Sequence, residues 1–263
     1  MGEGGVKEGN FRSRLLAGEP LIGTWVKTPS HIVAEVLGLT PLDCVCLDAE
    51  HAPFDRMAID GSLATLRAAH MPGLVRIPYS APEYALNALD CGASGVVAPH
   101  IKSAEEARGL VKSCRYGPGG RGYAGSSRAA AYTTSPMADN LRRGNEDTAV
   151  IAQIEDLEAQ EEIEEIAAVD GVDCLFIGRI DLTVAYGATS PNDERVVAAV
   201  ERVCKAARRA GRTIGMFVGD LGEIPKWRAA GASLFILKSD HAFILDGAKS
   251  LRNEFDQAVR STR

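Results

Sequence analysis

Two carboxylates stand just past short apolar runs of this sequence. Glu155 follows residues 149–153, and Asp181 follows residues 174–177. Hard divalent cations such as Mg²⁺ and Mn²⁺ are held in proteins by one or two carboxylates, while water and substrate oxygens complete the coordination. The pair therefore predicts a metal site that is left open for chemistry.

Further polar residues follow other apolar runs of the same kind. Asp48, Glu50 and His51 come directly after residues 44–47, and Arg76 ends the run at 74–76. In a parallel barrel the carboxyl ends of all strands meet on one face, where active sites are built. These residues could therefore add a general base and a cation to the two predicted metal ligands.

Short β-rich runs alternate with amphipathic stretches along the chain, which is typical of repeated βα units. No G-x-G-x-x-G follows the first run, so a closed (β/α)₈ TIM barrel is favoured over a doubly wound sheet, which remains the alternative. Helical patterns are predicted at residues 104–114, 157–168 and 194–210. The eight predicted strands are residues 23–26, 44–47, 74–76, 95–98, 150–153, 174–177, 213–216 and 234–237.

The length and composition fit one barrel domain. The chain has 263 residues, of which 46% are hydrophobic and 24% charged, and α/β barrels of about 250 residues commonly form a single domain. We expect residues 1–263 to form one domain. Within it, residues 1–18 are expected to be a flexible N-terminal segment and residues 240–260 a closing C-terminal helix.

The net charge of −6 excludes a strongly cationic surface, so nucleic-acid and membrane partners are not expected. The first residues lack the apolar stretch of a signal peptide, and no run reaches the roughly 20 apolar residues of a membrane span. The six cysteines include no C-x-x-C pair and are predicted to be reduced core residues. A cytoplasmic location is expected.

The longest irregular segment, residues 116–134, contains the glycine-rich stretch 117–122 and Ser126. Its backbone N–H groups could hold a phosphate or carboxylate, but no G-K-[ST] sequence indicates a nucleotide. We predict a lid or binding loop, with a flexible surface loop as the alternative.

Five ordered motifs between about residues 20 and 245 resemble the HpcH/HpaI class II pyruvate aldolases. The resemblance implies a (β/α)₈ barrel of the phosphoenolpyruvate/pyruvate-binding type and a divalent metal (Mg²⁺, Mn²⁺ or Co²⁺). It also implies a 2-keto acid and an aldehyde as substrates, and a homo-oligomer, commonly a hexamer that exchanges C-terminal helices. The motifs are residues 47–51 (LDAEH), 75–78 (VRIP), 115–122 (RY through RG), 153–155 (QIE) and 176–182 (FIGRIDL).

The resemblance also implies roles for individual residues. Glu155 and Asp181 match the metal ligands, and Arg76 matches the cation on the keto oxygen. His51 matches the base, with Asp90 or Asp48 as its carboxylate partner. The implied substrate-binding residues, besides Arg76, are Gln153, Gly178, Ser126 and Trp25.

The implied reaction explains these residue types. A metal that polarises a keto group acidifies the neighbouring methyl group, and a fixed guanidinium can stabilise the oxyanion that develops when a proton leaves. A histidine that is neutral near pH 7 is a suitable base, although a metal-bound hydroxide would compete. We therefore expect aldol cleavage of 4-hydroxy-2-oxo acids and its reverse.

The sequence departs from the family pattern in places that affect the shape of the pocket. The usual Gly-Pro-Ala-Asp reads Gly178, Arg179, Ile180, Asp181 here, so Arg179 could bind a second carboxylate, pair with another subunit or lie on the surface. His100 and Lys238 are further departures whose roles stay open.

Other interpretations compete with the metal-dependent aldolase. Lys27 or Lys238 could form a Schiff base after burial lowers its pKa, a related barrel could cleave coenzyme A esters, or the barrel could be non-catalytic. Single residues also have structural interpretations: Glu155 could stabilise a helix N-terminus, Asp181 could be an N-cap, and Arg76 could pair with a structural carboxylate.

Overall fold

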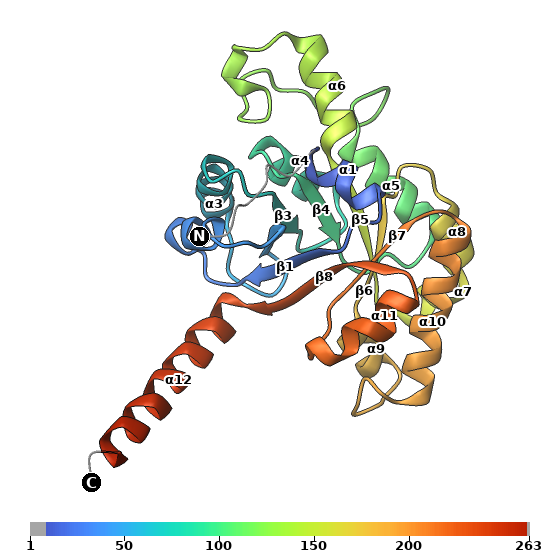
Figure 1. The fold of residues 1–263 in the computed structure, drawn as a ribbon. Coiled ribbons are helices and arrows are strands. Elements are labelled where there is room, and N and C mark those ends of the chain that lie inside the picture. Colours follow the sequence, from blue (N-terminus) through green and yellow to red (C-terminus); the bar gives the residue numbers. More distant parts are fainter. Residues whose placement is uncertain (1–8, 262–263) are drawn as a thin grey trace.

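The computed structural model describes residues 9–261, in which eight parallel strands form a closed barrel in sequence order (Figure 1). This confirms the predicted (β/α)₈ barrel and excludes a doubly wound sheet. All eight predicted strands are present within two residues of their expected bounds. They are β1 (Leu21–Val26), β2 (Cys44–Asp48), β3 (Gly73–Arg76), β4 (Gly95–Ala98), β5 (Ala149–Ile154), β6 (Cys174–Ile177), β7 (Thr213–Met216) and β8 (Ala232–Ser239).

The helices surround the barrel, and one predicted helix is divided. The pattern at residues 157–168 forms two short helices that meet at Glu162, which has ψ 18°. The helical elements are α1 (Phe11–Leu16), α2 (His31–Gly38), α3 (Arg56–Ala68), α4 (Pro82–Asp90), α5 (Ala104–Cys114), η1 (Ala131–Thr133), α6 (Met137–Asp147), α7 (Leu157–Glu161), α8 (Ile163–Ala168), α9 (Arg179–Ala185), α10 (Glu194–Arg209), η2 (Leu221–Glu223), α11 (Ile224–Ala229) and α12 (Asp240–Arg260).

Alternation of side chains along the strands explains both the core and the site. On β2, Cys44 and Cys46 belong to the cluster inside the barrel, whereas Val45 and Leu47 belong to the cluster between strands and helices. Successive strand residues point to opposite faces, so the next inward position on β2 is Asp48. The same alternation leads from Leu74 to Arg76, from Ile151 to Gln153 and from Trp25 to Lys27.

Helix α1 closes the amino-terminal end of the barrel, which corrects the expectation of a flexible segment at residues 1–18. Asn10 caps the helix by accepting a hydrogen bond from the Ser13 amide. Phe11 and Leu15 are buried in the inner cluster of the barrel. These two buried side chains hold the helix against the barrel. Residues 1–8 of the predicted flexible segment lie outside the described residues.

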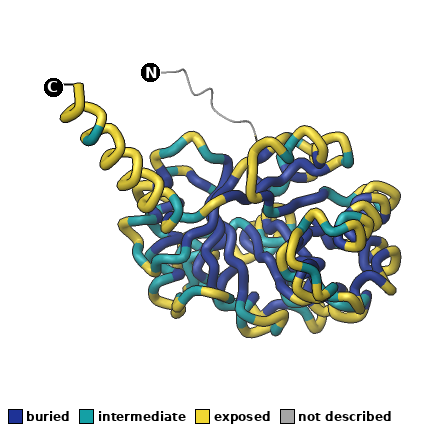
Figure 2. Tube along the Cα trace, turned by 90° about the horizontal axis from the view of Figure 1, so that it is seen from below, coloured by how far each residue is buried: buried dark blue, intermediate teal, exposed yellow. Residues whose placement is uncertain are grey.

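Helix α12 has the predicted bounds but does not cover the barrel. It begins at the Ser239 cap and extends away from the strands, exposed along nearly its whole length (Figures 1 and 2). Its only buried residue is Asp240, which accepts backbone N–H bonds from Lys27 and Thr28. The helix exposes the large apolar side chains of Phe243, Ile244, Leu245, Leu251, Phe255 and Val259.

The six cysteines are free and buried, as predicted. Burial raises the pKa of the Cys114 thiol to about 12, so it stays protonated at neutral pH. No helix within residues 9–261 is both long and apolar enough to span a bilayer.

Candidate active site

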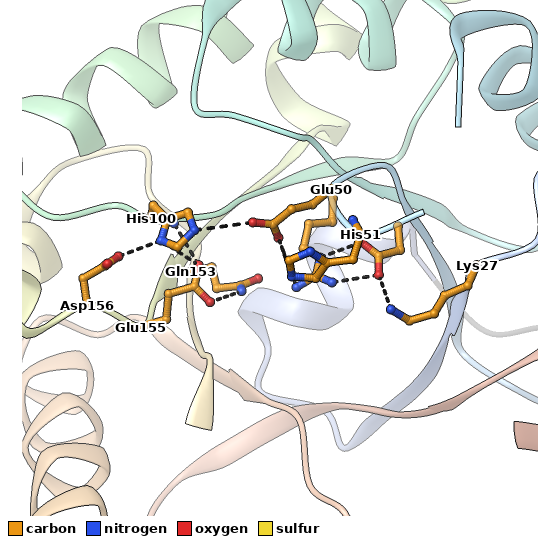
Figure 3. A network of polar contacts seen from close by, with 9 residues as sticks. Lys27, Glu50, His51, His100, Gln153, Glu155 and Asp156 are labelled. Atoms are coloured by element: carbon orange, nitrogen blue, oxygen red, sulfur yellow. Dashed lines mark hydrogen bonds and ion pairs between the residues drawn. The ribbon is translucent and has the colours of Figure 1, made fainter. Parts of the chain in front are cut away.

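Three residues at the barrel mouth, Lys27, Asp48 and Arg76, form what we call the ion-paired cluster. Asp48 and Arg76 are register partners on β2 and β3. The Arg76 guanidinium donates to both Asp48 oxygens, from Nε at 3.0 Å and from Nη2 at 2.8 Å. Lys27 Nζ lies 2.8 Å from Asp48 Oδ2 (Figure 3). Burial opposes ionisation of Asp48, but these two cations outweigh it and lower the pKa of the carboxyl to about 2.

Arg76 is held in one orientation by an aromatic ring as well as by Asp48. Its guanidinium carbon lies 4.4 Å from the centroid of the Trp25 ring. That ring meets Phe176 edge-on at 5.9 Å inside the barrel. Stacking of this kind fixes the plane of the guanidinium, so Trp25 is placed beneath Arg76 as part of the floor of the site.

Three other residues, Glu50, His100 and Glu155, form what we call the acidic cluster. Their potential ligand atoms all lie within 4.8 Å of one another. Glu155 follows β5, is 3% exposed, and accepts hydrogen bonds from Gln153 Nε2 and from the His100 amide. These bonds aim its carboxylate at the mouth, where Glu50 and His100 face it (Figure 3).

Burial disfavours the ionised form of both carboxyl groups in the acidic cluster. Burial, together with the negative charge of Glu155, raises the pKa of Glu50 to about 7, although Arg76 opposes this shift. Burial also raises the pKa of Glu155, and the nearby Asp181 charge adds to the effect. The buried Oε1 of Gln153 accepts no hydrogen bond from the described residues. A divalent cation would neutralise this cluster, so the residues fit a hard metal ion.

Asp181 lies in the first turn of α9, and it does not serve as the N-cap, a position that belongs to Gly178. Its half-buried carboxylate forms no hydrogen bond or ion pair with the described residues. Its negative charge acts to raise the pKa of both Glu155 and His51. A Cβ at Gly178 would stand 2.5 Å from Glu155 Oε2. Glycine is therefore required beside the Glu155 carboxylate. Asp181 is not among the three residues whose ligand atoms lie within 4.8 Å of one another.

His51 lies at the rim of the mouth with 54% of its side chain exposed. Its backbone amide donates to Asp48 Oδ1 at 3.2 Å, and its ring Nε2 is 3.7 Å from Glu50 Oε2. Burial and the Arg76 charge lower the pKa of the imidazole, which keeps it neutral near pH 7. The oxygens of Asp48 are engaged by Arg76 and Lys27, so the carboxylate beside the His51 ring is Glu50.

Asp90 and Ser126 are placed away from this group of residues. Asp90 ends α4, at the opposite end of the barrel from the mouth, and its Oδ1 accepts a bond of 2.6 Å from Arg121 Nη2. Exposed Ser126 lies in the loop at 116–134, where Arg128 is tied to Asp60 on α3 at 2.7 Å. Within this chain, neither residue is brought to the predicted metal ligands.

Arg179 is buried, which removes the surface interpretation. Its Nη1 lies 2.7 Å from Glu223 Oε2, and its guanidinium carbon lies 5.0 Å from the Trp227 ring centroid. Lys238 is half-exposed and pairs with Asp246 at 2.6 Å on α12. Arg179 therefore joins the start of α9 to α11, and the Lys238 ammonium is engaged by α12.

The fold and the site define a (β/α)₈-barrel protein with an acid-rich mouth, and comparison with known proteins gives the family. Residues 21–244 match the model of the HpcH/HpaI aldolase/citrate lyase family. The chain is 35% identical to a hydroxypyruvate/pyruvate aldolase of Paraburkholderia phytofirmans, covering 93% of this chain and 96% of that protein. It is 30% identical to a 4-hydroxy-2-oxo-heptane-1,7-dioate aldolase of Shigella flexneri, covering 94% and 93%.

A solved structure agrees with this assignment. The crystal structure of an HpcH/HpaI aldolase/citrate lyase family protein from Burkholderia cenocepacia superimposes with a TM-score of 0.87 at 35% identity, covering 93% of this chain and 98% of that one. The chain therefore belongs to the HpcH/HpaI aldolase family, and the predicted resemblance is confirmed.

Two residues of the acidic cluster, Glu50 and His100, were missing from the predicted ligand set. In the sequence, Glu50 follows the second predicted strand, and His100 is a departure from the family pattern. Their signal in the sequence is position: each stands two residues past the last residue of its strand, Asp48 or Ala98. Glu155 and Asp181 also follow strand ends, but at one and four residues past Ile154 and Ile177, so the spacing differs among the four.

Proposed function

We propose that this protein is a divalent-metal-dependent aldolase that removes a methyl proton from a pyruvate-type 2-keto acid and adds the resulting enolate reversibly to an aldehyde. The observation that carries the proposal is the arrangement of the mouth. Glu155 and the acidic cluster stand beside a guanidinium that Asp48 and Trp25 hold in place. Membership of the HpcH/HpaI family supports the same activity.

Glu155 and Asp181 would hold the metal, which we propose to be Mg²⁺, Mn²⁺ or Co²⁺. When bound, such an ion supplies Lewis acidity that lowers the pKa of protons next to a keto group. Gln153 orients Glu155 by donating to its Oε2. Gly178 leaves the space that this carboxylate occupies.

Arg76 is positioned to stabilise the oxyanion of the enolate. Its guanidinium keeps its charge, because hydrogen bonding to Asp48 raises the pKa of Arg76 despite burial. Asp48 uses the Nε and Nη2 groups, and Nη1 is 3.2 Å from Glu50 Oε2. Glu50 Oε2 accepts no hydrogen bond in the described chain, so Nη1 is the donor that can turn to a substrate oxygen.

His51 is the base that we assign to the methyl proton. The ring is exposed at the mouth and is neutral near pH 7 because its pKa is lowered, as proton abstraction requires. The proton would return through the same imidazole to the alkoxide formed in the addition step. We place Glu50 beside the ring, where its charge favours the imidazolium that forms.

A Schiff-base mechanism is the leading alternative, but the two candidate lysines both form ion pairs that disfavour it. Lys27 Nζ is engaged by buried Asp48, and Lys238 Nζ by Asp246, whereas an amine nucleophile must be free and uncharged. Borohydride treatment with pyruvate separates the mechanisms, since the metal mechanism forms no covalent adduct. A trapped adduct of pyruvate on Lys27 would refute our proposal.

Chelation provides the direct test of activity. We expect EDTA to abolish cleavage of a 4-hydroxy-2-oxo acid, and Mg²⁺, Mn²⁺ or Co²⁺ to restore it. Full activity after complete chelation would contradict the proposal.

We also propose that the protein is a homo-oligomer in which α12 packs on a second copy of the chain. An isolated 21-residue helix with several exposed large apolar side chains is not expected to stay uncovered in water. Light scattering after size-exclusion chromatography would measure the assembly. A monomer at micromolar concentration would contradict this part of the proposal, and a hexamer would agree with the family resemblance.

A further inference from the structure

His100 lies among three carboxylates of the mouth, between β4 and β5. Its ring Nδ1 is 2.9 Å from Asp156 Oδ2, and its Nε2 is 3.5 Å from Glu50 Oε1. Its backbone amide donates to Glu155 Oε1 at 3.0 Å. Its ring Nδ1 also lies 3.5 Å from Glu155 Oε1, so the ring faces all three carboxylates (Figure 3).

The orientation of the ring matches that of a metal-ligating histidine. Such a histidine almost always donates its other ring N–H to a carboxylate or carbonyl, which fixes the tautomer. Asp156 Oδ2 is placed to accept the Nδ1 proton, and in that neutral tautomer the lone pair is on Nε2. The lone pair is on the side of Glu50, whose Oε1 is 3.5 Å away; ligand atoms about 2.1 Å from a shared ion lie roughly 3–4 Å apart.

Two further observations indicate that a ligand belongs here. The backbone of His100 has φ 55°, an uncommon conformation for a residue other than glycine, and such conformations gather at functional sites. Gln153 is 1% exposed, lies on the adjacent strand end, and has an Oε1 without a hydrogen-bond donor among residues 9–261. A hydrated cation would satisfy that oxygen.

We propose that His100 Nε2 is a nitrogen ligand of the metal ion that Glu155 binds, with Glu50 alongside and Asp156 as the residue that orients the ring. This inference rests on the metal of the proposed function and changes its ligand set from all-oxygen to mixed nitrogen and oxygen. Imidazole favours Co²⁺ and other transition metals over Mg²⁺. The chain is therefore expected to discriminate in favour of Co²⁺ or Mn²⁺ over Mg²⁺.

Pulsed electron paramagnetic resonance of Mn²⁺ bound to the metal-free protein tests this ligand without measuring activity, because ¹⁴N of a coordinated imidazole modulates the signal. We expect the modulation in the wild type and its loss in His100→Asn, a substitution chosen because asparagine tolerates positive φ. His51→Asn is the matched control, since it removes the other imidazole of the mouth. It should keep the modulation.

Asp156→Asn provides a second variant that keeps the ring. It should retain the nitrogen modulation while weakening Mn²⁺ binding by about tenfold, the usual effect of losing a partner that orients a ligand. In competition titrations, His100→Asn should lower the preference for Co²⁺ over Mg²⁺ by at least about tenfold.

Each other outcome overturns the inference. Mn²⁺ that binds the wild type without nitrogen modulation excludes His100 as a ligand and leaves the aldolase proposal standing. Modulation that persists in His100→Asn, or that disappears in both His variants, has the same consequence. A wild-type protein that binds no Mn²⁺ refutes the metal-dependent aldolase as well.

Discussion

The two clusters at the barrel mouth differ in how completely their charges are paired. In the ion-paired cluster, buried Asp48 is engaged by Arg76 and Lys27, and its pKa falls to about 2. In the acidic cluster, the pKa of Glu50 rises to about 7. Complete pairing fixes the position of a side chain, whereas incomplete pairing leaves ligand positions for a cation. Arg76 is therefore a rigid, oriented charge, and the incomplete pairing around Glu155 supports the proposal that it binds a metal.

The largest expected effect comes from removing the ligand that the acidic cluster is built around. Glu155→Gln should lower kcat/KM by at least about 10³-fold, since metal ions supply several kcal/mol of transition-state stabilisation. Mn²⁺ binding, measured by calorimetry, should weaken in parallel. Loss of activity with unchanged metal affinity would contradict the assigned role of the acidic cluster.

Arg76 connects the two clusters, so its replacement tests the ion-paired side. Arg76→Ala should lower kcat by about 10²–10³, the range for losing one donor to a developing oxyanion. Arg76→Lys is the matched control, because it keeps the charge but lacks the planar fork that binds Asp48. A rate in Arg76→Ala close to that of the wild type would make Arg76 a purely structural partner of Asp48.

His51 lies at the rim between the clusters, and its replacement should affect proton transfer more than binding. His51→Ala should slow exchange of pyruvate methyl protons by about 10²-fold, the lower end for general base catalysis. Mn²⁺ affinity should change little. The opposite pattern, with intact exchange and weakened metal binding, would make His51 a ligand instead of a base.

The smallest effect concerns stability and depends on pH. The folded-state pKa of Asp48 is about 2, below its ordinary 3.8, so its ionised form stabilises the fold above about pH 4, and that contribution is lost as the pH falls towards 2. Asp48→Asn should therefore reduce the free energy of unfolding by about 2 kcal/mol at pH 6. At pH 3 the difference in free energy of unfolding between the variant and the wild type should be about 1 kcal/mol smaller than at pH 6.

Urea unfolding at both pH values measures this difference. If the difference in free energy of unfolding between wild type and Asp48→Asn is the same at pH 6 and pH 3, the ionised form of Asp48 does not stabilise the fold.

The barrel and much of the mouth could be predicted because strand periodicity is local. Residues two apart on a strand share a face, so Cys46 and Asp48, or Ile151 and Gln153, follow from the sequence as one interior-facing row. Apolar runs that end in polar residues mark the point where each strand reaches the mouth. Glu155, Asp48 and Arg76 were found in this way.

Partner choice could not be predicted, because it depends on contacts between distant segments. Asp48 lies beside Arg76 through the register of β2 with β3, and it also receives Lys27 from the end of β1. From the sequence, Asp48 was also a candidate partner of the His51 ring. The place of His100 in the acidic cluster was not predicted, because the direction of its ring depends on a backbone φ of 55°. The residue type alone does not indicate that conformation.

Exchange of pyruvate methyl protons with deuterated water, followed by NMR without any aldehyde, measures enolate formation by itself. We predict exchange with Mg²⁺ or Mn²⁺ in the wild type, and its loss on chelation and in Glu155→Gln. Exchange that continues at full rate without metal, or in the absence of the Glu155 carboxylate, would refute the metal-dependent mechanism.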